Sequence, residues 1–125
     1  MTQVLLVEDD DAVALIVEAV LAGSGRAVRR VSGAGAAREA AREAAPAVLV
    51  ADLNLPDGED GVTLARALRT EWPDLPVVLI SGAFEGGEGT SGTATAEVPG
   101  GVCLAKPFRR AALLAAIDAA ERWRG

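Results

Sequence analysis

The sequence of 125 residues contains no histidine. This absence excludes nucleophiles that are activated by a neighbouring histidine, and it excludes metal sites with imidazole ligands. Any chemistry must therefore use carboxylates, hydroxyls, lysine or a bound metal ion.

Aromatic residues are also scarce, at 3% of the chain, and the net charge is −6. Proteins that bind nucleic acid usually present a basic face to the phosphates, and many stack bases on aromatic side chains. Nucleic acid is therefore not expected as a direct partner. Most arginines stand at helical spacing from acidic residues, which predicts a solvated, ion-paired surface. The sharper alternative is a cationic ligand held by clustered carboxylates.

The single cysteine, Cys103, cannot form an internal disulfide, and no basic leader precedes the short apolar run at the N-terminus. No stretch approaches the roughly 18 apolar residues that a membrane helix needs. We therefore expect a cytoplasmic protein without membrane contact. The length is that of one ordinary domain, here residues 1–125.

Short apolar runs alternate with segments of helical periodicity. The runs have the composition of buried strands and cover residues 3–7, 48–51, 77–80 and 102–105, and residues 27–31 predict a further, weaker strand. Helical spacing predicts helices that begin at Asp11 and end near Gly23, that cover 36–44 and 61–72, and that contain Leu113 and continue to the C-terminus. Five alternations with long connections predict a parallel sheet with helices on both faces.

Polar residues follow the predicted strands, all at one edge of such a sheet. They are Glu8, Asp9, Asp10, Asp52, Ser81 and Lys106. Converging carboxylates repel each other unless a cation neutralises them, and Mg²⁺ is the hard, oxygen-seeking choice. An aspartate beside this metal and a lysine is a plausible nucleophile toward phosphorus, and such transfer needs no histidine.

Taken together, these stretches resemble a known family. In order they are VLLVEDD, VLVADLNLPDG, VVLISG and CLAKPF, and they resemble the receiver domain of bacterial two-component response regulators over essentially the whole chain. The resemblance implies a flavodoxin-like, doubly wound α/β fold with a five-stranded parallel sheet of order 2-1-3-4-5. It also implies a phosphoprotein that acts as a signalling switch, whose only chemistry is its own phosphorylation and dephosphorylation.

The family pattern also assigns roles to individual residues. Asp52 matches the phosphoryl acceptor and lies at the metal, Asp9 matches a direct Mg²⁺ ligand, and Glu8 matches a ligand through water. Asn54 would offer its backbone carbonyl to the metal.

On the phosphoryl side, Ser81 and the backbone N–H of Gly82 would donate hydrogen bonds to the transferred group, and Lys106 would pair with it. The Lys106–Pro107 bond matches one that the family holds cis.

The other acidic residues have plainer interpretations. Asp10 is expected to cap the first helix, and a solvated turn is expected for Asp57, Glu59 and Asp60. Asp52 taken alone would be read as a cap or turn former, and Ser81 as a strand-end hydroxyl bonded to backbone. Trp72 and Trp123 are expected to pack at helix ends.

The chain departs from the family pattern in three places. Cys103 stands where receivers usually carry Tyr or Phe, three residues before the lysine. The glycine-rich stretch 82–101 replaces the expected fourth helix and predicts a short, mobile or absent helix, because each Gly costs about 1 kcal/mol relative to Ala. Gly61 follows Asp52 by nine positions where eight is usual.

The expected partners are a histidine kinase or phosphotransfer protein and an unidentified downstream protein, with the receiver a monomer or weak dimer. Because Gly125 ends the sequence, we expect a stand-alone receiver or a domain excised from a longer chain. A phosphorylation-independent adaptor remains the alternative. A phosphatase is disfavoured because Asn54 stands where such enzymes carry an acid–base carboxylate, and a flavin-binding role because carboxylates follow the first strand.

Overall fold

The computed structural model describes residues 3–55, 58–81 and 98–123. Its strands are β1 (Gln3–Val7), β2 (Ala27–Val31), β3 (Val48–Asp52), β4 (Val77–Ser81) and β5 (Val102–Ala105). Its helices are α1 (Asp11–Gly23), α2 (Ala34–Glu43), α3 (Gly61–Arg69) and α5 (Arg110–Glu121).

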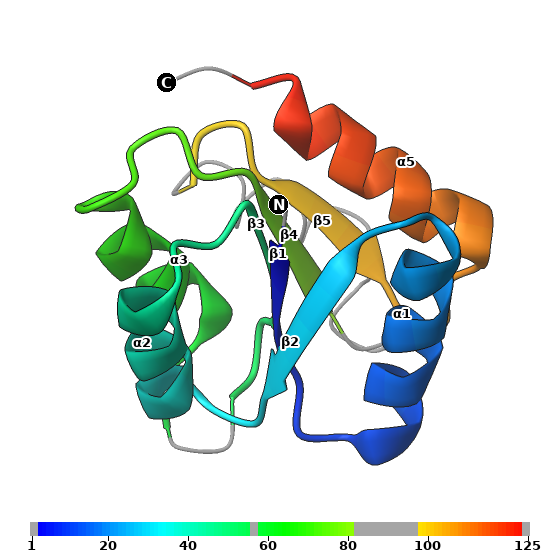
Figure 1. Cartoon of the computed structure of the whole chain (residues 1–125), viewed down its shortest axis with the longest axis horizontal. Helices are drawn as coiled ribbons and strands as arrows, with labels where there is room; N and C mark the ends of the chain where they lie inside the picture. The colour runs from blue at the N-terminus through cyan, green and yellow to red at the C-terminus, as the bar shows by residue number, and fades with distance from the viewer. Residues whose placement is uncertain (1–2, 56–57, 82–97, 124–125) are drawn as a thin grey trace.

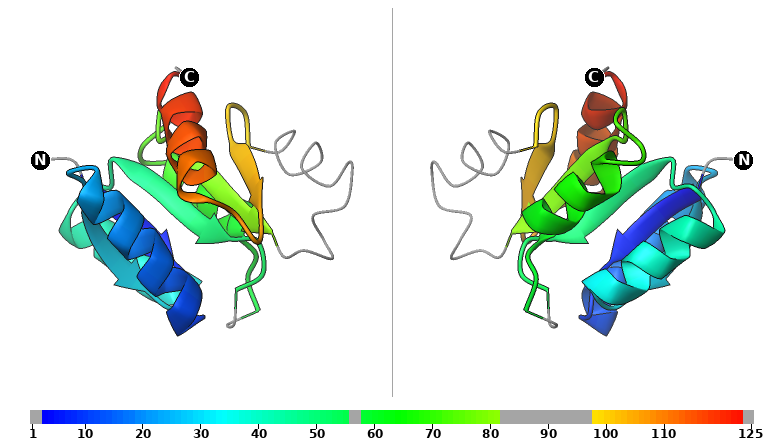
Figure 2. Two further views of the ribbon diagram at one scale, coloured as in Figure 1. Left: turned by 90° about the vertical axis from the view of Figure 1, so that its right-hand side faces the viewer. Right: turned by 90° about the vertical axis from the view of Figure 1, so that its left-hand side faces the viewer.

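The strands form one parallel sheet in the order β2-β1-β3-β4-β5, as the sequence predicted (Figure 1). Helices α1 and α5 cover one face, and α2 and α3 cover the other (Figure 2). Because all strands run the same way, their carboxyl ends meet at one edge. This edge lies at the bottom of Figure 1, away from both termini.

Alternate strand residues supply two separate cores, as a strand period of two requires. On the α1 and α5 face, Leu6, Val50 and Ile80 pack with residues such as Val17 and Ile117. On the other face the side chains of Leu5, Leu49, Ala51 and Leu79 pack against Ala37 and Leu64. The second core contains much alanine, so α2 can lie close to the sheet.

The sequence-based ends of five elements were wrong by a few residues. Helix α2 begins at Ala34 and ends at Glu43, where 36–44 was expected, and α5 ends at Glu121 and does not continue to the C-terminus. Strands β3 and β4 include Asp52 and Ser81 as their last residues. Helix α3 ends at Arg69 and not near Trp72, although the N–H of Trp72 still donates to the carbonyl of Leu68 at 3.0 Å. The side chain of Trp72 packs against the core, so the helical spacing of apolar residues extends past the last residue of α3. This spacing explains why the helix was predicted too long.

Ion pairs are present on the surface, as predicted, and those of Arg26 and Arg29 join different elements of the fold. Arg26 of the α1–β2 turn region donates two hydrogen bonds to Glu121 of α5, at 2.8 and 2.9 Å. Arg29 of β2 pairs with Glu43 of α2 at 2.6 Å. These pairs tie helices to the edge strand of the sheet, and pairs as exposed as Arg29 and Glu43 contribute about 0.2–1 kcal/mol.

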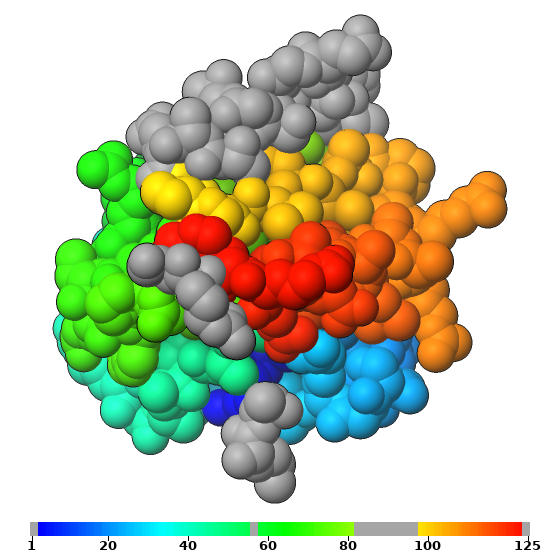
Figure 3. All heavy atoms as spheres, turned by 90° about the horizontal axis from the view of Figure 1, so that it is seen from above, coloured from blue at the N-terminus to red at the C-terminus, as the bar shows by residue number. Residues whose placement is uncertain are grey.

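At the end of the sheet where the strands begin, opposite the carboxyl edge, Arg69 connects three segments. Its guanidinium donates to the carbonyl of Leu75 at 2.9 and 3.1 Å and to that of Pro99 at 2.6 Å, and it lies 4.0 Å from the ring centre of Trp123. Figure 3 shows the end of α5 beside the segment that starts at Val98. A Cβ on Gly100 would stand 2.1 Å from the Trp123 ring, so only glycine fits there. Both tryptophans therefore pack at helix ends, as predicted.

The prediction for the glycine-rich stretch 82–101 falls mostly on residues 82–97, which lie outside the described part of the chain. Within the described residues, no helix is both long and apolar enough to span a bilayer.

Candidate functional site

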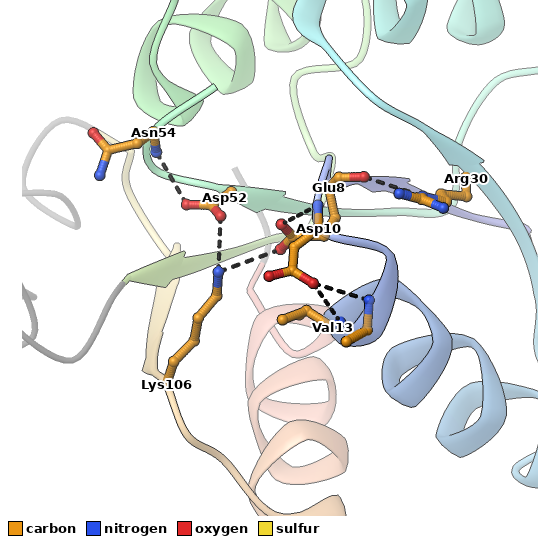
Figure 4. A network of polar contacts seen from close by, with 8 residues as sticks. Glu8, Asp10, Val13, Arg30, Asp52, Asn54 and Lys106 are labelled. Carbon is orange, nitrogen blue, oxygen red and sulfur yellow. Dashed lines mark hydrogen bonds and ion pairs between the residues drawn. The ribbon is translucent and has the colours of Figure 1, made fainter. Parts of the chain in front are cut away.

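The sheet brings the predicted polar residues to one edge (Figure 4). Glu8 follows β1, Asp52 and Ser81 end β3 and β4, and Lys106 follows β5. The N–H of Lys106 donates to the carbonyl of Ser81 at 2.8 Å, which continues the pairing of β4 and β5 to the site. Four separate parts of the sequence therefore meet where parallel strands end.

Three carboxylates form the acidic centre of this edge. One oxygen each of Glu8, Asp9 and Asp52 lies within 4.8 Å of the others. Glu8 is fully buried, Asp52 is 7% exposed, and Asp9 faces solvent. Oxygen ligands grouped in this way, with one side open to water, suit a hard divalent cation.

Lys106, the only lysine of the chain, supplies the nearest cation. Its Nζ lies 3.0 Å from Asp52 Oδ2 and 3.6 Å from Glu8 Oε1. Burial alone would lower the pKa of Lys106, but the hydrogen bond and charge of Asp52, with the charge of Glu8, raise its pKa above the ordinary value. Lys106 is therefore protonated, and its single positive charge faces the three carboxylates of the acidic centre.

Hydrogen bonds fix the backbone and one carboxylate oxygen of Glu8, but the other oxygen has no hydrogen bond from the described part of the chain. Its backbone N–H donates to the carbonyl of Val31 at 3.0 Å, and Glu8 Oε2 accepts from the N–H of Asp10 at 3.1 Å. Among the described residues, Glu8 Oε1 is the buried side-chain oxygen without a hydrogen-bond partner. Burial, and then the charges of Asp52 and Asp9, raise the pKa of Glu8. A buried carboxylate oxygen that has an ion pair at 3.6 Å but no hydrogen bond within the described residues costs free energy, which a cation or its bound water would recover.

Asp10 has the structural role that the sequence predicted. Its Oδ1 accepts hydrogen bonds from the N–H groups of Ala12 and Val13, at 2.9 and 3.2 Å, and caps α1. Although Asp10 adjoins Asp9 in sequence, its carboxylate serves the helix and not the acidic centre.

The backbone around Asp52 is closely packed. The N–H of Asn54 donates to Asp52 Oδ1 at 3.1 Å, which turns that oxygen toward the loop. A Cβ on Gly61 would lie 2.5 Å from the carbonyl oxygen of Asp52, so the start of α3 can approach β3 only with glycine there. Gly61 makes this close approach although it follows Asp52 by nine positions.

The prediction of a solvated turn was wrong for Glu59. Its carboxylate accepts two hydrogen bonds from Arg38 of α2, one of them at 2.7 Å, and only 22% of its side chain is exposed. Asp60 is exposed, but its Oδ1 accepts from the N–H of Thr63 at 2.7 Å and caps α3. The sequence signal for this cap was an acid directly before a helical period. Asp57 lies outside the described residues.

The remaining predictions concern β5 and its flanks. The Lys106–Pro107 bond is cis, as predicted. Cys103 pairs with Leu79 in the sheet and is half-buried against the α2 and α3 core, and burial raises the pKa of its thiol. Gly82 lies outside the described residues.

Sequence reasoning missed one arginine near the site. Arg30 of β2 donates from Nε to the backbone carbonyl of Glu8 at 3.0 Å and from Nη2 to Asp11 at 2.8 Å. No sequence signal singled it out, because Arg29 and Arg30 are neighbours in the same short strand and look alike in sequence.

A parallel sheet in this order, with an acidic centre and a lysine at its carboxyl edge, defines the receiver class of signalling proteins. The chain belongs to this class, because the family model for the response regulator receiver domain matches its residues 4–118. Membership implies phosphorylation-based two-component signalling.

Individual relatives agree with this assignment. The chain is 39% identical over 88 residues to the KDP operon transcriptional regulatory protein KdpE of Escherichia coli, covering 68% of this chain and 37% of KdpE. A response regulator receiver protein from Sinorhizobium medicae has a structure with a TM-score of 0.85 and 30% identity, covering 99% of this chain and 97% of that one.

The receiver domain of NtrX from Brucella abortus gives a TM-score of 0.83 at 28% identity, with 95% of this chain and 98% of that one covered. The chain spans well under half of the length of the curated relatives that it matches, for example 37% of KdpE and 16% of the DNA-binding transcriptional regulator NtrC of Escherichia coli.

Proposed function

We propose that this chain is a phospho-accepting switch in which Asp52 receives a phosphoryl group from the phosphohistidine of a histidine kinase or phosphotransfer protein. The phosphorus–nitrogen bond breaks with its electron pair going to the imidazole, and a carboxylate oxygen of Asp52 forms the new bond to phosphorus. The observation that carries this proposal is the position of Asp52, nearly buried at a strand end, in contact with Lys106 and beside two further carboxylates.

Mg²⁺ is the proposed cofactor, and the residues present fit it. Asp9 and Asp52 would bind it directly, Glu8 through water, and Asn54 through its backbone carbonyl. Two observations support this choice: Glu8 Oε1 is buried without a hydrogen bond to any described residue, and three carboxylates share the single charge of Lys106. When bound, the ion would neutralise charge on the transferring phosphoryl group.

The chain's own residues would then orient the phosphoryl group. Lys106 is already hydrogen-bonded to Asp52 Oδ2, so its ammonium could follow the charge from the carboxylate to the phosphoryl oxygens. Ser81, at the end of the neighbouring strand, and the backbone N–H of Gly82 would donate the remaining hydrogen bonds. Positioning of this kind is most of what phosphoryl transfer requires.

Phosphorylation would add negative charge beside Lys106 and Ser81 and so change the surface that a downstream protein recognises. Cys103 replaces the usual aromatic residue, and this half-buried thiol offers no large side chain that could move between two positions. We propose that residues 1–125 act as one receiver unit, a monomer or weak dimer. The DNA-binding role named for NtrC belongs to that protein.

The adaptor alternative has less support, because an adaptor would not need this site to stay intact. It predicts partner binding that is unchanged by a phosphodonor or by Asp52→Ala. The phosphatase alternative would need an acid–base carboxylate near Asp52, where Asn54 stands.

The test is incubation with Mg²⁺ and a small acyl phosphate, followed by intact-mass measurement. The proposal predicts one phosphoryl adduct for each chain, none after chelation of the metal, and none for Asp52→Asn. An equal adduct on Asp52→Asn would contradict the assignment, and no adduct on the unaltered protein would contradict the function.

A further inference from the structure

Arg30 connects the edge strand β2 to the beginning of the acidic centre. Its Nε donates to the backbone carbonyl of Glu8 at 3.0 Å, and its Nη2 lies 2.8 Å from Asp11 Oδ1. Figure 4 shows Arg30 and Lys106 on opposite sides of Glu8. Arg30 therefore contacts the connection that carries Glu8, Asp9 and Asp10, but not their carboxylates.

This contact completes the restraint of Glu8. The N–H of Glu8 donates to Val31 and its carbonyl accepts from Arg30, so β2 holds the peptide groups on both sides of this residue. Its Oε2 accepts from Asp10, which leaves Oε1 directed toward Lys106. The restraint from Arg30 comes mainly from the hydrogen bond to the Glu8 carbonyl, because the side chain of Asp11 is 91% exposed and an ion pair to it contributes little.

Two effects of Arg30 on a bound cation have opposite signs. As a positive charge near the acidic centre, Arg30 would repel Mg²⁺, and its removal would tighten binding. As a fixed donor, it would keep the backbone of the metal-binding connection in place, and its removal would loosen binding. Outer hydrogen-bond partners of metal ligands typically change metal affinity by roughly tenfold to a hundredfold.

We infer that Arg30 is a positioning residue for the divalent cation site, because it holds the Glu8 carbonyl and the first residue of α1 so that Glu8 and Asp9 face Asp52. This inference rests on the proposed function, which supplies the cation. Arg30 touches neither the cation nor the phosphoryl group; it acts through Glu8 and Asp11.

The neighbouring Arg29 provides a matched control. It lies on the same strand, carries the same charge and has its own ion pair, to Glu43 at the last residue of α2. Arg29→Met and Arg30→Met therefore change the net charge equally, but only Arg30→Met removes a bond to the metal-binding connection.

The experiment is a titration of each variant with MgCl₂, followed by the amide NMR shifts of residues 8–10 and 52–55. We expect Arg30→Met to weaken Mg²⁺ binding by roughly tenfold or more, and Arg29→Met to stay within about twofold of the unaltered protein. Thermal unfolding verifies that each variant is folded. If Arg30→Met does not fold, Arg30→Lys, which keeps the charge but not the fork, is expected to weaken binding by a smaller factor.

Unchanged or tighter binding by Arg30→Met would overturn the inference, because the charge effect would then dominate. Equal weakening by both arginine variants would also overturn it, since the effect would not come from the contact with Glu8. If the unaltered protein binds no Mg²⁺, the proposed cofactor fails and the inference fails with it. If it binds Mg²⁺ but Asp52 accepts no phosphoryl group, only the proposed function fails.

Discussion

Lys106 Nζ lies 3.0 Å from Asp52 Oδ2, although 54 positions separate the two residues in sequence. Their strands are not neighbours, because β4 lies between β3 and β5. Lys106 therefore reaches across the end of β4, past Ser81, to the buried aspartate. This one contact brings a carboxylate, its counter-charge and a hydroxyl together at the carboxyl edge, where we propose that the phosphoryl group binds.

Replacing Lys106 with Met should destabilise the metal-free protein. The change leaves Asp52, whose side chain is 10% exposed, without its ion partner, and we expect a loss of about 1–3 kcal/mol in the free energy of unfolding. Urea unfolding with and without Mg²⁺ measures it. Because Mg²⁺ neutralises the same carboxylates, the ion should recover part of the loss, and a loss that is independent of Mg²⁺ would argue against a shared site.

Glu8→Gln should stabilise the metal-free protein at neutral pH. Burial raises the pKa of Glu8 in the folded state above the ordinary value of 4.5, so folding makes this carboxyl group harder to ionise. Below pH 4.5 the glutamate and glutamine proteins should differ little. As pH rises through the raised folded-state pKa, the glutamate protein alone must bury a charge and loses stability relative to the variant.

The measurement is thermal unfolding of the glutamate and glutamine proteins, with a chelator present to remove metal ions, from below pH 4.5 to neutral pH. A glutamine side chain can still accept the hydrogen bond from Asp10, so the comparison isolates the charge. A variant that is less stable than the unaltered protein at neutral pH would show that Glu8 is stabilised in its ionised form. In the presence of Mg²⁺ the advantage of the variant should shrink or reverse.

Gly61→Ala should disturb the backbone of Asp52. The new methyl group would stand 2.5 Å from the Asp52 carbonyl oxygen, and overpacking of this kind costs about 1–3 kcal/mol. The rate of phosphoryl adduct formation should fall with it. Gly35→Ala in α2 is the matched control: a Cβ there meets nothing within 4 Å, and the exchange should stabilise the helix by about 0.5–1 kcal/mol. Equal effects of both exchanges would refute the close approach.

Arg69→Met should destabilise the end of the molecule that is remote from the site. The variant loses the donors to Leu75 and Pro99 and the contact with Trp123, and we expect a loss of about 1–3 kcal/mol. Arg42→Met, on the exposed side of α2, should change stability by less than about 0.5 kcal/mol. Mg²⁺ affinity should stay unchanged in both variants. A change in affinity would show that the end of the sheet where the strands begin is coupled to the acidic centre at the carboxyl edge.

The sheet and its functional edge could be predicted from sequence for a physical reason. Parallel strands buried on both faces are continuous apolar runs, and the first polar residue after each run must emerge at the shared edge. This rule places Asp52, Ser81 and Lys106 at the carboxyl edge from the sequence alone. The strand order came from the resemblance to receivers and not from the pattern of the runs.

The contacts of long charged side chains could not be predicted. Glu59 reads as a solvated turn because its sequence neighbours are Gly58 and Asp60, yet it pairs with Arg38, 21 positions away. Arg29 and Arg30 are alike in sequence, and only the faces of β2 separate their partners. The end of α3 was extended too far because Trp72 continues the apolar period after the helix has ended.

The most direct test of the account is chemical mapping of the acceptor. Borohydride reduces an acyl phosphate on aspartate to homoserine, so the protein is treated with a small acyl phosphate and Mg²⁺, reduced, digested and sequenced by mass. The account predicts homoserine at position 52 alone, and none when the metal is chelated. Homoserine at Asp9, Asp10 or another aspartate, or its absence from position 52 with Mg²⁺ present, would contradict the central claim that Asp52 is the phosphoryl acceptor.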